Sequence, residues 1–319
     1  MKTVFIINKN AGQRKVIENL IRKVPESAEV YLTKAKGDAT RFINEYCENY
    51  GPARFIACGG DGTINEVING VLNCDGAEAG AVPVGTGNDF VRNFPHCDFF
   101  DTSLQMTCET ETVDAIFYTS YFQGEEKCGY GINMFNIGFD CNVADKKEQL
   151  SHIWGKLAYF VSILINLIAK KGADVKIEMN GECIHKGGLL LTSVANGCYC
   201  GGGIKSNPQS DIKDGLINVN IIKNISRMRF ISLLPRYMKG THPNLKNIEK
   251  YISTKMCEEI TVTPLDGKMK VCVDGEIIST EKIKEELLMD QRERNIWGNS
   301  TIIGIVLVLF IVAMPKFKK

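Results

Sequence analysis

Residues 58–70, CGGDGTINEVING, place glycines and one aspartate directly after an apolar run. Glycine allows unusual backbone angles and a close approach of the backbone to a ligand. An aspartate in such a loop can hold a cation or a water molecule. Thr63 and Glu66 fit the Thr-x-x-Glu pattern of a capping box, so we expect a helix to start here. The segment predicts either a tight strand–helix turn without a ligand or a site for phosphate groups.

Two further segments favour the phosphate site. Residues 83–90, PVGTGNDF, and residues 8–12, NKNAG, also combine glycine with small polar side chains after an apolar run. Open α/β sheets bind ligands at the carboxyl ends of their strands, and helix N-termini there attract anions. Three such loops at one sheet edge suit a polyphosphate better than three unrelated turns. The P-loop and protein-kinase motifs are absent from the sequence, so any nucleotide is held by another architecture.

The elements that must position these loops alternate between strand-like and helix-like patterns over the first 112 residues. We expect strands at 3–8, 29–33, 55–58 and 81–84, with helices at 15–24, 39–46 and 64–71. This alternation predicts an α/β domain with a mostly parallel sheet. Beyond it, short apolar strands and turn residues predict a mostly-β sandwich or barrel. Two helical stretches, 153–171 and about 226–239, interrupt the β pattern.

The expected organisation is an α/β N-terminal domain over 1–112, a β-sandwich C-terminal domain over 113–279, and a short hydrophobic tail over 293–319. Residues 280–288, TEKIKEELL, are expected to form a charged helix or strand, and we expect residues 280–292 to return to the first domain. The stretch 153–171 is either a lipid-entry helix or a core helix of the second domain.

The tail residues 301–314 are uncharged, with Trp297 before them and lysines after them. As a helix they are shorter than a bilayer core of about 30 Å, but starting at Ile296 makes the length borderline sufficient. The stretch also lacks the polar face that a soluble surface helix needs. We therefore expect membrane association; the alternative is a buried final helix or strand.

Composition narrows the class of protein. The chain has 319 residues, 44% of them hydrophobic, and a net charge of +1 from 38 basic and 37 acidic residues. This balance argues against a nucleic-acid-binding surface. The 12 cysteines contain no Cys-x-x-Cys pair, and the N-terminus lacks a secretory signal. Reduced thiols in the cytoplasm are expected.

The glycine loops also occur with other motifs in a characteristic order. GGDGTINEVING and GTGNDF are followed by NIGFD (136–140), NGCYCGGGIKSNPQSDIKDGLINV (196–219) and VDGE (273–276). In this order the chain, to about residue 288, resembles the diacylglycerol kinase family in its bacterial lipid kinase branch. The resemblance implies an ATP-binding α/β domain, a β-sandwich lipid domain and an active cleft between them.

The resemblance also implies roles for individual residues. Nucleotide contacts are expected from the three loops, the helix after the second loop and a threonine of another helix: Asn8, Lys9, Asn10, Ala11, Gly12, Thr40, Gly59, Gly60, Asp61, Gly62, Thr63, Ile64, Asn65, Glu66 and Thr86. Family members usually have proline at the position of Lys9 and serine or threonine near Asn10, so the first loop of this chain departs from the family pattern at these two positions.

A magnesium site is expected in SDIKDGLI, formed by Asp214 with main-chain oxygens of Asp211 and Leu216. The alternative there is a plain Asp-Gly turn. Asp274 and Glu276 match the catalytic acid segment of the family. Asp-Gly at 266–267 and 274–275 is also a hairpin signal, and only the second is followed by glutamate.

The function expected from this resemblance is transfer of the γ-phosphoryl group of ATP to a lipid alcohol, with diacylglycerol as the first substrate and phosphatidic acid as the product. Asp61 would engage the magnesium ion of the nucleotide, and Asp274 or Glu276 would accept the alcohol proton. Expected partners are the lipid substrate and a membrane surface, at the cytoplasmic face, with no nucleic acid; family analogy is compatible with a homodimer. The alternatives are an NAD kinase and a non-catalytic membrane-associated sensor of nucleotide or lipid.

Overall fold

The computed structural model describes residues 1–138, 172–287 and 308–311. The chain divides into two compact units, one formed by Met1–Asp114 with Val306–Lys319 and the other by Ala115–Ile305. The first therefore corresponds to the expected α/β domain and the second to the expected β domain. Residues 153–171, expected to form a helix, lie outside the described residues.

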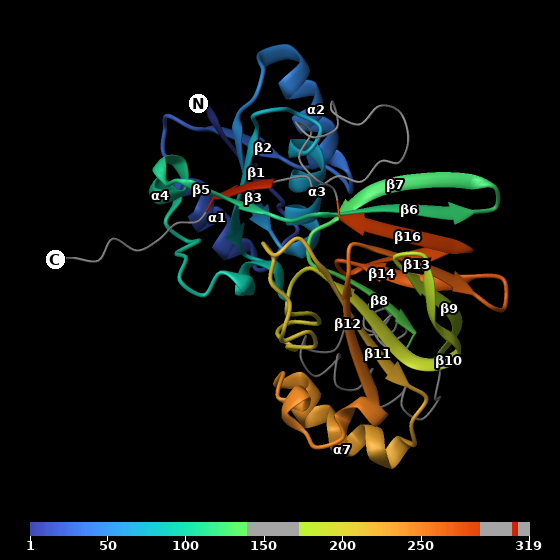
Figure 1. Cartoon of the computed structure of the whole chain (residues 1–319). Coiled ribbons are helices and arrows are strands. Elements are labelled where there is room, and N and C mark those ends of the chain that lie inside the picture. Colours follow the sequence, from blue (N-terminus) through green and yellow to red (C-terminus); the bar gives the residue numbers. More distant parts are fainter. Residues whose placement is uncertain (139–171, 288–307, 312–319) are drawn as a thin grey trace. The chain divides into compact units, whose positions relative to one another are not determined.

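The first unit is built on a six-stranded sheet with the strand order β2-β1-β3-β4-β17-β5 (Figure 1). Strands β1 to β4 are parallel to their neighbours, which confirms the expected parallel sheet. Its strands are β1 (Thr3–Ile7), β2 (Glu29–Leu32), β3 (Arg54–Gly59), β4 (Glu78–Pro83), β5 (Thr110–Val113) and β17 (Val308–Ile311). Its helices are α1 (Arg14–Lys23), α2 (Asp38–Tyr50), α3 (Asp61–Val71), the short η1 (Phe90–Asn93) and α4 (Thr102–Thr107).

Strands β1 and β3 are buried over almost their whole length, as expected for a sheet covered on both faces. Ile17 and Leu20 of α1 pack against Phe5 of β1 and its neighbours on one face. Helices α2 and α3 pack on each other closely at Gly70, where a Cβ atom would lie 2.8 Å from the Cβ of Ile43. The packed core thereby fixes the directions in which the loops after β1, β3 and β4 leave the sheet.

The second unit is an antiparallel sheet with the order β15-β14-β8-β10-β9-β13-β16-β6-β7, in which β11 pairs with β10 and β12 (Figure 1). Its strands are β6 (Ile116–Phe122), β7 (Glu125–Gly131), β8 (Met134–Gly138), β9 (Ala173–Met179), β10 (Glu182–Ala195), β11 (Ile217–Lys223), β12 (Ile252–Cys257), β13 (Glu259–Pro264), β14 (Met269–Val273), β15 (Glu276–Thr280) and β16 (Lys282–Leu287). Among the described residues of this unit, the helical segments are α7 (Arg227–Met238), η2 (His242–Asn244) and η3 (Ile248–Lys250). Alternating side chains of these strands fill an apolar interior that includes Phe135, Ile177 and Val219. The expected β sandwich and the helix near 226–239 are confirmed.

The expected return of 280–292 to the first unit is wrong for Lys282–Leu287. This segment forms β16, paired with β13 on one side and β6 on the other. Ile283 and Glu285 are buried and Lys284 is half-buried between them, the two-residue period of a strand. The chain instead returns to the first unit through β17.

Strand β17 occupies the place between β4 and β5, parallel to the first and antiparallel to the second. For the tail the sequence allows two outcomes, membrane association and a final helix or strand. Val308–Ile311 form a strand, which is the second of these. The remaining tail residues lie outside the described residues, and their membrane association stays a prediction. Among the residues that the structure describes, no helix is both long and apolar enough to cross a bilayer.

The turn Asp266-Gly267 does not join paired strands. Strand β13 before it pairs with β9 and β16, whereas β14 after it pairs with β8 and β15. The hairpin expected at 266–267 is therefore wrong, because the chain crosses to another part of the sheet there. Asp274-Gly275 does form a two-residue hairpin turn, since Val273 pairs with Glu276 across it.

His242 gives the second unit an acid-sensitive contact. The ring is 1% exposed, packs against the Tyr237 ring at 5.1 Å between centroids, and has its pKa lowered to about 4, mainly by burial. Below its usual pKa of 6.5, the unfolded chain binds a proton that the folded chain rejects until about pH 4. Stability should therefore fall as the pH drops from 6.5 to 4, by up to about 3 kcal/mol at 1.36 kcal/mol per pKa unit. The measurement is the free energy of unfolding of the wild type and of His242→Gln, from denaturant titrations at several pH values between 4 and 6.5. If this free energy falls equally with pH in the two proteins, His242 is not the cause.

Glu285 is expected to lower the stability of the protein as the pH rises, whereas His242 lowers it as the pH falls. Its side chain is fully buried, and neither carboxyl oxygen has a hydrogen-bond partner among the described residues. Burial raises its pKa well above the usual 4.5, so stability should fall as the pH rises above that value. We expect Glu285→Met to raise the free energy of unfolding by roughly 1–3 kcal/mol at pH 8, the usual cost of a buried polar group without a partner. Unfolding of this variant at pH 5 and 8 is the measurement; a destabilised variant at pH 8 would show that the carboxyl has a partner in solution.

Candidate functional site

The three glycine loops of the first unit meet at the carboxyl ends of β1, β3 and β4, as expected from the sequence. The Asn8 N–H donates to the carbonyl of Cys58 at 3.0 Å, and the Val84 N–H donates to the carbonyl of Gly59 at 3.0 Å. A Cβ atom at Gly12 would overlap the carbonyl oxygen of Val84, and one at Gly85 would overlap the Cα of Gly60. Only glycine allows these loops to lie so close together. We call this arrangement the strand-end site.

Asp61 joins the second and third loops. It is the first residue of α3, and its Oδ1 accepts the backbone N–H groups of Asp89 at 2.7 Å and Phe90 at 3.1 Å. Its Oδ2 lies on the side of Gly87, where a Cβ atom would be 2.8 Å away. Burial raises the pKa of this carboxyl more than the backbone donors lower it. Oδ2 is therefore the oxygen that can face a cation or its water, while Oδ1 holds the loop.

The start of α3 differs from the expected capping box. The N-cap is Gly60 without a side-chain cap, so Thr63 lies inside the helix and accepts a hydrogen bond from Asn8 Nδ2 at 3.2 Å. The Glu66 carboxylate accepts the N–H groups of Gly37 at 2.9 Å and Ala39 at 3.3 Å. Glu66 thus caps α2 rather than α3, because the two helices pack side by side.

Several residues expected to bind nucleotide therefore have partners within the protein. Besides Glu66, the Thr40 hydroxyl donates to the carbonyl of Glu66 at 2.7 Å. Asn88, which is not among the expected nucleotide contacts, has φ 55°, donates from Nδ2 to the Gly85 carbonyl at 2.9 Å and supports the third loop. Lys9, Asn10, Gly12 and Thr86 are exposed. Glu66 and Thr40 therefore join α2 to α3, whereas the exposed residues are accessible to a ligand.

Asp274 of the second unit is fixed by the backbone around it. It is 8% exposed, has φ 48° and forms the turn between β14 and β15. Its Oδ2 accepts the Ile132 N–H at 2.7 Å, and its Oδ1 accepts the N–H groups of Asn133 at 3.0 Å and Met134 at 2.8 Å. The carboxylate therefore shapes the turn between β7 and β8. Glu276 begins β15 and is half-buried.

The turn before β8 is also tied to the segment 196–199. Asn133 Nδ2 donates to the Tyr199 carbonyl at 2.7 Å, and Asn196 Nδ2 donates to the Ile132 carbonyl at 2.9 Å. The turn before β8 and the segment 196–199, more than fifty residues apart in the chain, thus form one assembly with Asp274. Sequence reasoning missed Tyr118 near this assembly, whose pKa is raised by burial and by the charges of Asp274 and Glu276. Its nearness follows from the packing of Tyr118 on Phe135 of β8, with 5.4 Å between the ring centroids, and such tertiary packing has no local signal in the sequence.

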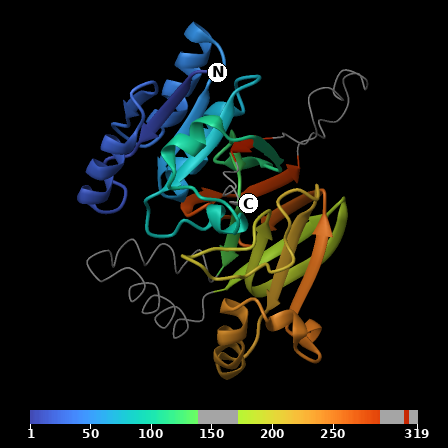
Figure 2. The same ribbon diagram turned by 90° about the vertical axis from the view of Figure 1, so that its left-hand side faces the viewer.

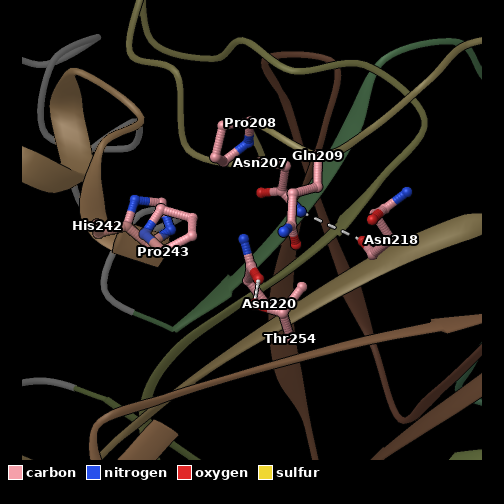
Figure 3. A pocket seen from close by; sticks show the side chains of 8 residues that line it. All are labelled: Asn207, Pro208, Gln209, Asn218, Asn220, His242, Pro243 and Thr254. Carbon is pink, nitrogen blue, oxygen red and sulfur yellow. Dashed lines mark hydrogen bonds between the residues drawn. The ribbon is translucent and has the colours of Figure 1, made fainter. Parts of the chain in front are cut away.

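The loop with the expected magnesium site is held on the sheet by buried amides (Figure 3). Asn207 accepts a hydrogen bond from Ser193 Oγ at 2.7 Å and donates from Nδ2 to the Asn218 carbonyl at 3.3 Å. Asn220 donates to the Ser206 carbonyl at 2.9 Å and accepts from Thr254 Oγ1 at 2.6 Å. The hollow between these residues and His242 is too narrow for a ligand, so the amides serve to position the loop.

Asp211 and Asp214 each accept a backbone hydrogen bond two residues ahead, from Lys213 at 3.1 Å and from Leu216 at 2.9 Å. Burial raises the pKa of Asp214, and the charge of Asp211 adds to it. A cation would relieve this repulsion, so the oxygen donors fit a divalent ion. Among the described residues, no three His, Cys, Asp or Glu side chains lie close enough together to hold a metal; the expected site uses one carboxylate with main-chain oxygens and stays a prediction.

Comparison with known proteins identifies the class. Residues 2–117 match the family described as the diacylglycerol kinase catalytic domain, and residues 133–288 match the YegS C-terminal NAD kinase beta sandwich-like domain. A putative diacylglycerol kinase from Bacillus anthracis has the same fold, with a TM-score of 0.68 and 22% sequence identity over 89% of this chain and 93% of that one. The two units together thus define the two-domain fold of this class.

Sequence relatives narrow the class to a family. Lipid kinase YegS of Escherichia coli K12 is 31% identical over 207 residues, 63% of this chain and 67% of the relative. A probable YegS-like lipid kinase of Enterobacter sp. is 30% identical over 230 residues, 69% of this chain and 74% of the relative. The chain belongs to the YegS-like lipid kinases with a diacylglycerol kinase catalytic domain, and it is an enzyme, a phosphotransferase.

Proposed function

We propose that this enzyme transfers the γ-phosphoryl group of ATP to the hydroxyl group of a membrane lipid, with diacylglycerol as the substrate and phosphatidic acid as the product. The observation that supports the nucleotide assignment most is the meeting of three glycine loops around Asp61 at the strand ends. Diacylglycerol is the first choice because the matched domain bears its name. Sphingoid bases, phosphatidylglycerol and polyprenols present the same reacting group.

In this proposal the loops of the strand-end site bind the phosphates through backbone N–H groups at the start of α3. Asp61 would hold the counterion of the phosphates through Oδ2, while Oδ1 keeps the third loop in place. Magnesium bound with the nucleotide would neutralise the charge of the phosphates. The loop of Asp211 and Asp214 would hold a second, structural magnesium ion.

The lipid hydroxyl loses its proton to a carboxylate of the hairpin that contains Asp274 and Glu276. A carboxylate suffices as a base because the proton can leave late, as the new oxygen–phosphorus bond forms. The three backbone donors to Asp274 hold its charge in one place, and the half-buried Glu276 lies two residues away. Tyr118 packs on Phe135 of β8 with 5.4 Å between the ring centroids, and burial together with the charges of both acids raises its pKa, which makes its hydroxyl a candidate for orienting the alcohol.

The substrate is tested with ATP labelled in the γ-phosphate, magnesium, and a panel of diacylglycerol, sphingosine, phosphatidylglycerol, a polyprenol and NAD. We expect label in phosphatidic acid and none in NADP. Label in another lipid would replace the substrate and keep the reaction. Label in NADP alone would show that the enzyme is an NAD kinase instead; the family description of the second domain contains that name. Label in no acceptor would favour a sensor.

A further inference from the structure

Helix α7 is attached to the second unit by one face. Phe230 and Tyr237 pack with Ile222 and Leu190 in an apolar cluster, and Leu233 is 7% exposed. At about 100° per residue these three helix positions lie on the same side. In both views α7 lies at one end of the neighbouring strands β11 and β12 (Figures 1 and 2).

The opposite face of α7 exposes three apolar side chains, beside Ser232 and Lys239, where a surface helix is normally polar throughout. Met228 is 76% exposed and Ile231 is 46% exposed, and Pro235 is exposed between them and the helix end. The helical period places these three side chains opposite the buried face. We call Met228, Ile231 and Pro235 the outer face of α7. Burial within the second unit does not explain its apolar character.

The segment around this face is strongly basic. Residues 223–255 contain eight lysines and arginines and one acidic residue, Glu249, in a chain whose net charge is +1. The basic residues are Lys223, Arg227, Arg229, Arg236, Lys239, Lys246, Lys250 and Lys255. Two of them are held by neutral groups, Lys223 Nζ by the Glu249 carbonyl at 3.3 Å and the Arg229 guanidinium over the Tyr251 ring at 4.7 Å. Their positive charge therefore stays available to an outside partner.

We propose that the outer face of α7 docks on an anionic lipid bilayer. Its apolar side chains enter the boundary between headgroups and acyl chains, and the surrounding cations bind the anionic headgroups. The exposed apolar residues suit the apolar part of the bilayer, and the eight basic residues of segment 223–255 suit its anionic headgroups. The purpose of docking, access to a membrane lipid, rests on the proposed function. Docking itself needs neither ATP nor a substrate.

The test is sedimentation of the full-length protein with vesicles, without ATP. Vesicles of phosphatidylcholine alone are compared with vesicles that also contain phosphatidylglycerol. We expect binding to the anionic vesicles, weakened by salt, and little binding to the neutral ones. At about fivefold in affinity per basic residue near the surface, Arg236→Gln with Lys239→Gln should weaken binding roughly 25-fold. Met228→Ser with Ile231→Ser should weaken it by tenfold or more.

Matched controls come from exposed positions of the first unit. Lys15→Gln with Arg22→Gln on α1 removes the same charge, and Val30→Ser on β2 removes an apolar side chain that is 44% exposed. Both controls should bind vesicles as the wild type does. Wild-type protein that ignores anionic vesicles, or α7 variants that bind like the controls, would overturn the proposal. So would α7 variants that change only the oligomeric state in analytical ultracentrifugation, because the face would then be a contact between copies.

Kinase activity on a detergent-dispersed lipid separates this proposal from the proposed function. The α7 variants should phosphorylate the dispersed lipid at the wild-type rate, since docking is no longer required. If no lipid is phosphorylated while vesicle binding still depends on α7, the docking surface stands and the proposed reaction fails.

Discussion

Replacing Asp61 with asparagine should lower kcat/KM for phosphoryl transfer by about 100- to 1000-fold in a protein that stays folded. Asparagine keeps an oxygen that can accept the N–H groups of Asp89 and Phe90, so the third loop keeps its anchor. The substitution removes the negative charge on the side of Gly87, where we place the counterion of the phosphates. Steady-state kinetics over a range of magnesium concentrations, with thermal unfolding beside them, measure both effects.

Asp61→Leu is the matched structural variant. It removes both acceptors and leaves two buried backbone N–H groups without a partner, at about 1–3 kcal/mol each. We expect it to lose stability as well as activity. A wild-type rate for Asp61→Asn would contradict the role of the charge, and equal stability of the two variants would contradict the anchoring role of Oδ1.

Asp274→Asn is expected to affect both folding and catalysis. The carboxylate accepts three backbone N–H groups on its two oxygens, whereas an asparagine offers one oxygen and places an NH₂ group against at least one N–H. An unsatisfied buried donor costs about 1–3 kcal/mol, so the free energy of unfolding should fall by that amount. The turn before β8 would lose its fixed shape, and kcat should fall by about 100- to 10,000-fold, the range for loss of a general base.

Glu276→Gln separates the two acids of the hairpin. Glu276 is half-buried at the start of β15, so the change should leave the free energy of unfolding within about 0.5 kcal/mol of the wild type. Its loss of kcat should be smaller than that of Asp274→Asn, since the sequence motif points to Asp274 as the base. A larger loss for Glu276→Gln would assign the proton to Glu276 and leave Asp274 as a positioning residue.

The elements and the strand-end site were predictable because their causes are local. The buried strands β1, β3 and β4 appear in the sequence as short apolar runs, and parallel strands bring their carboxyl ends to one edge. The glycines of the loops follow from the same argument, since Gly12 and Gly85 lie where no Cβ atom fits. A local pattern therefore sufficed for the place of the site.

The partners of individual side chains were not predictable in the same way. Thr63 and Glu66 satisfy a capping pattern, but the packing of α2 on α3 gives the Glu66 carboxylate better donors at Gly37 and Ala39. Glu285 is buried because β16 lies between β13 and β6, a pairing of segments far apart in the chain. The place of β17 beside β4 has the same origin. Each of these depends on tertiary contacts that no window of sequence contains.

The most direct test of the central claim is the fate of the γ-phosphate of ATP in the presence of a lipid alcohol. The purified full-length enzyme is incubated with labelled ATP, magnesium and detergent-dispersed diacylglycerol, and the lipid fraction is separated. We predict label on the lipid hydroxyl with the wild type and a loss of about 100-fold or more with Asp61→Asn. Label that appears only in inorganic phosphate, or lipid label that Asp61→Asn leaves unchanged, would contradict the account.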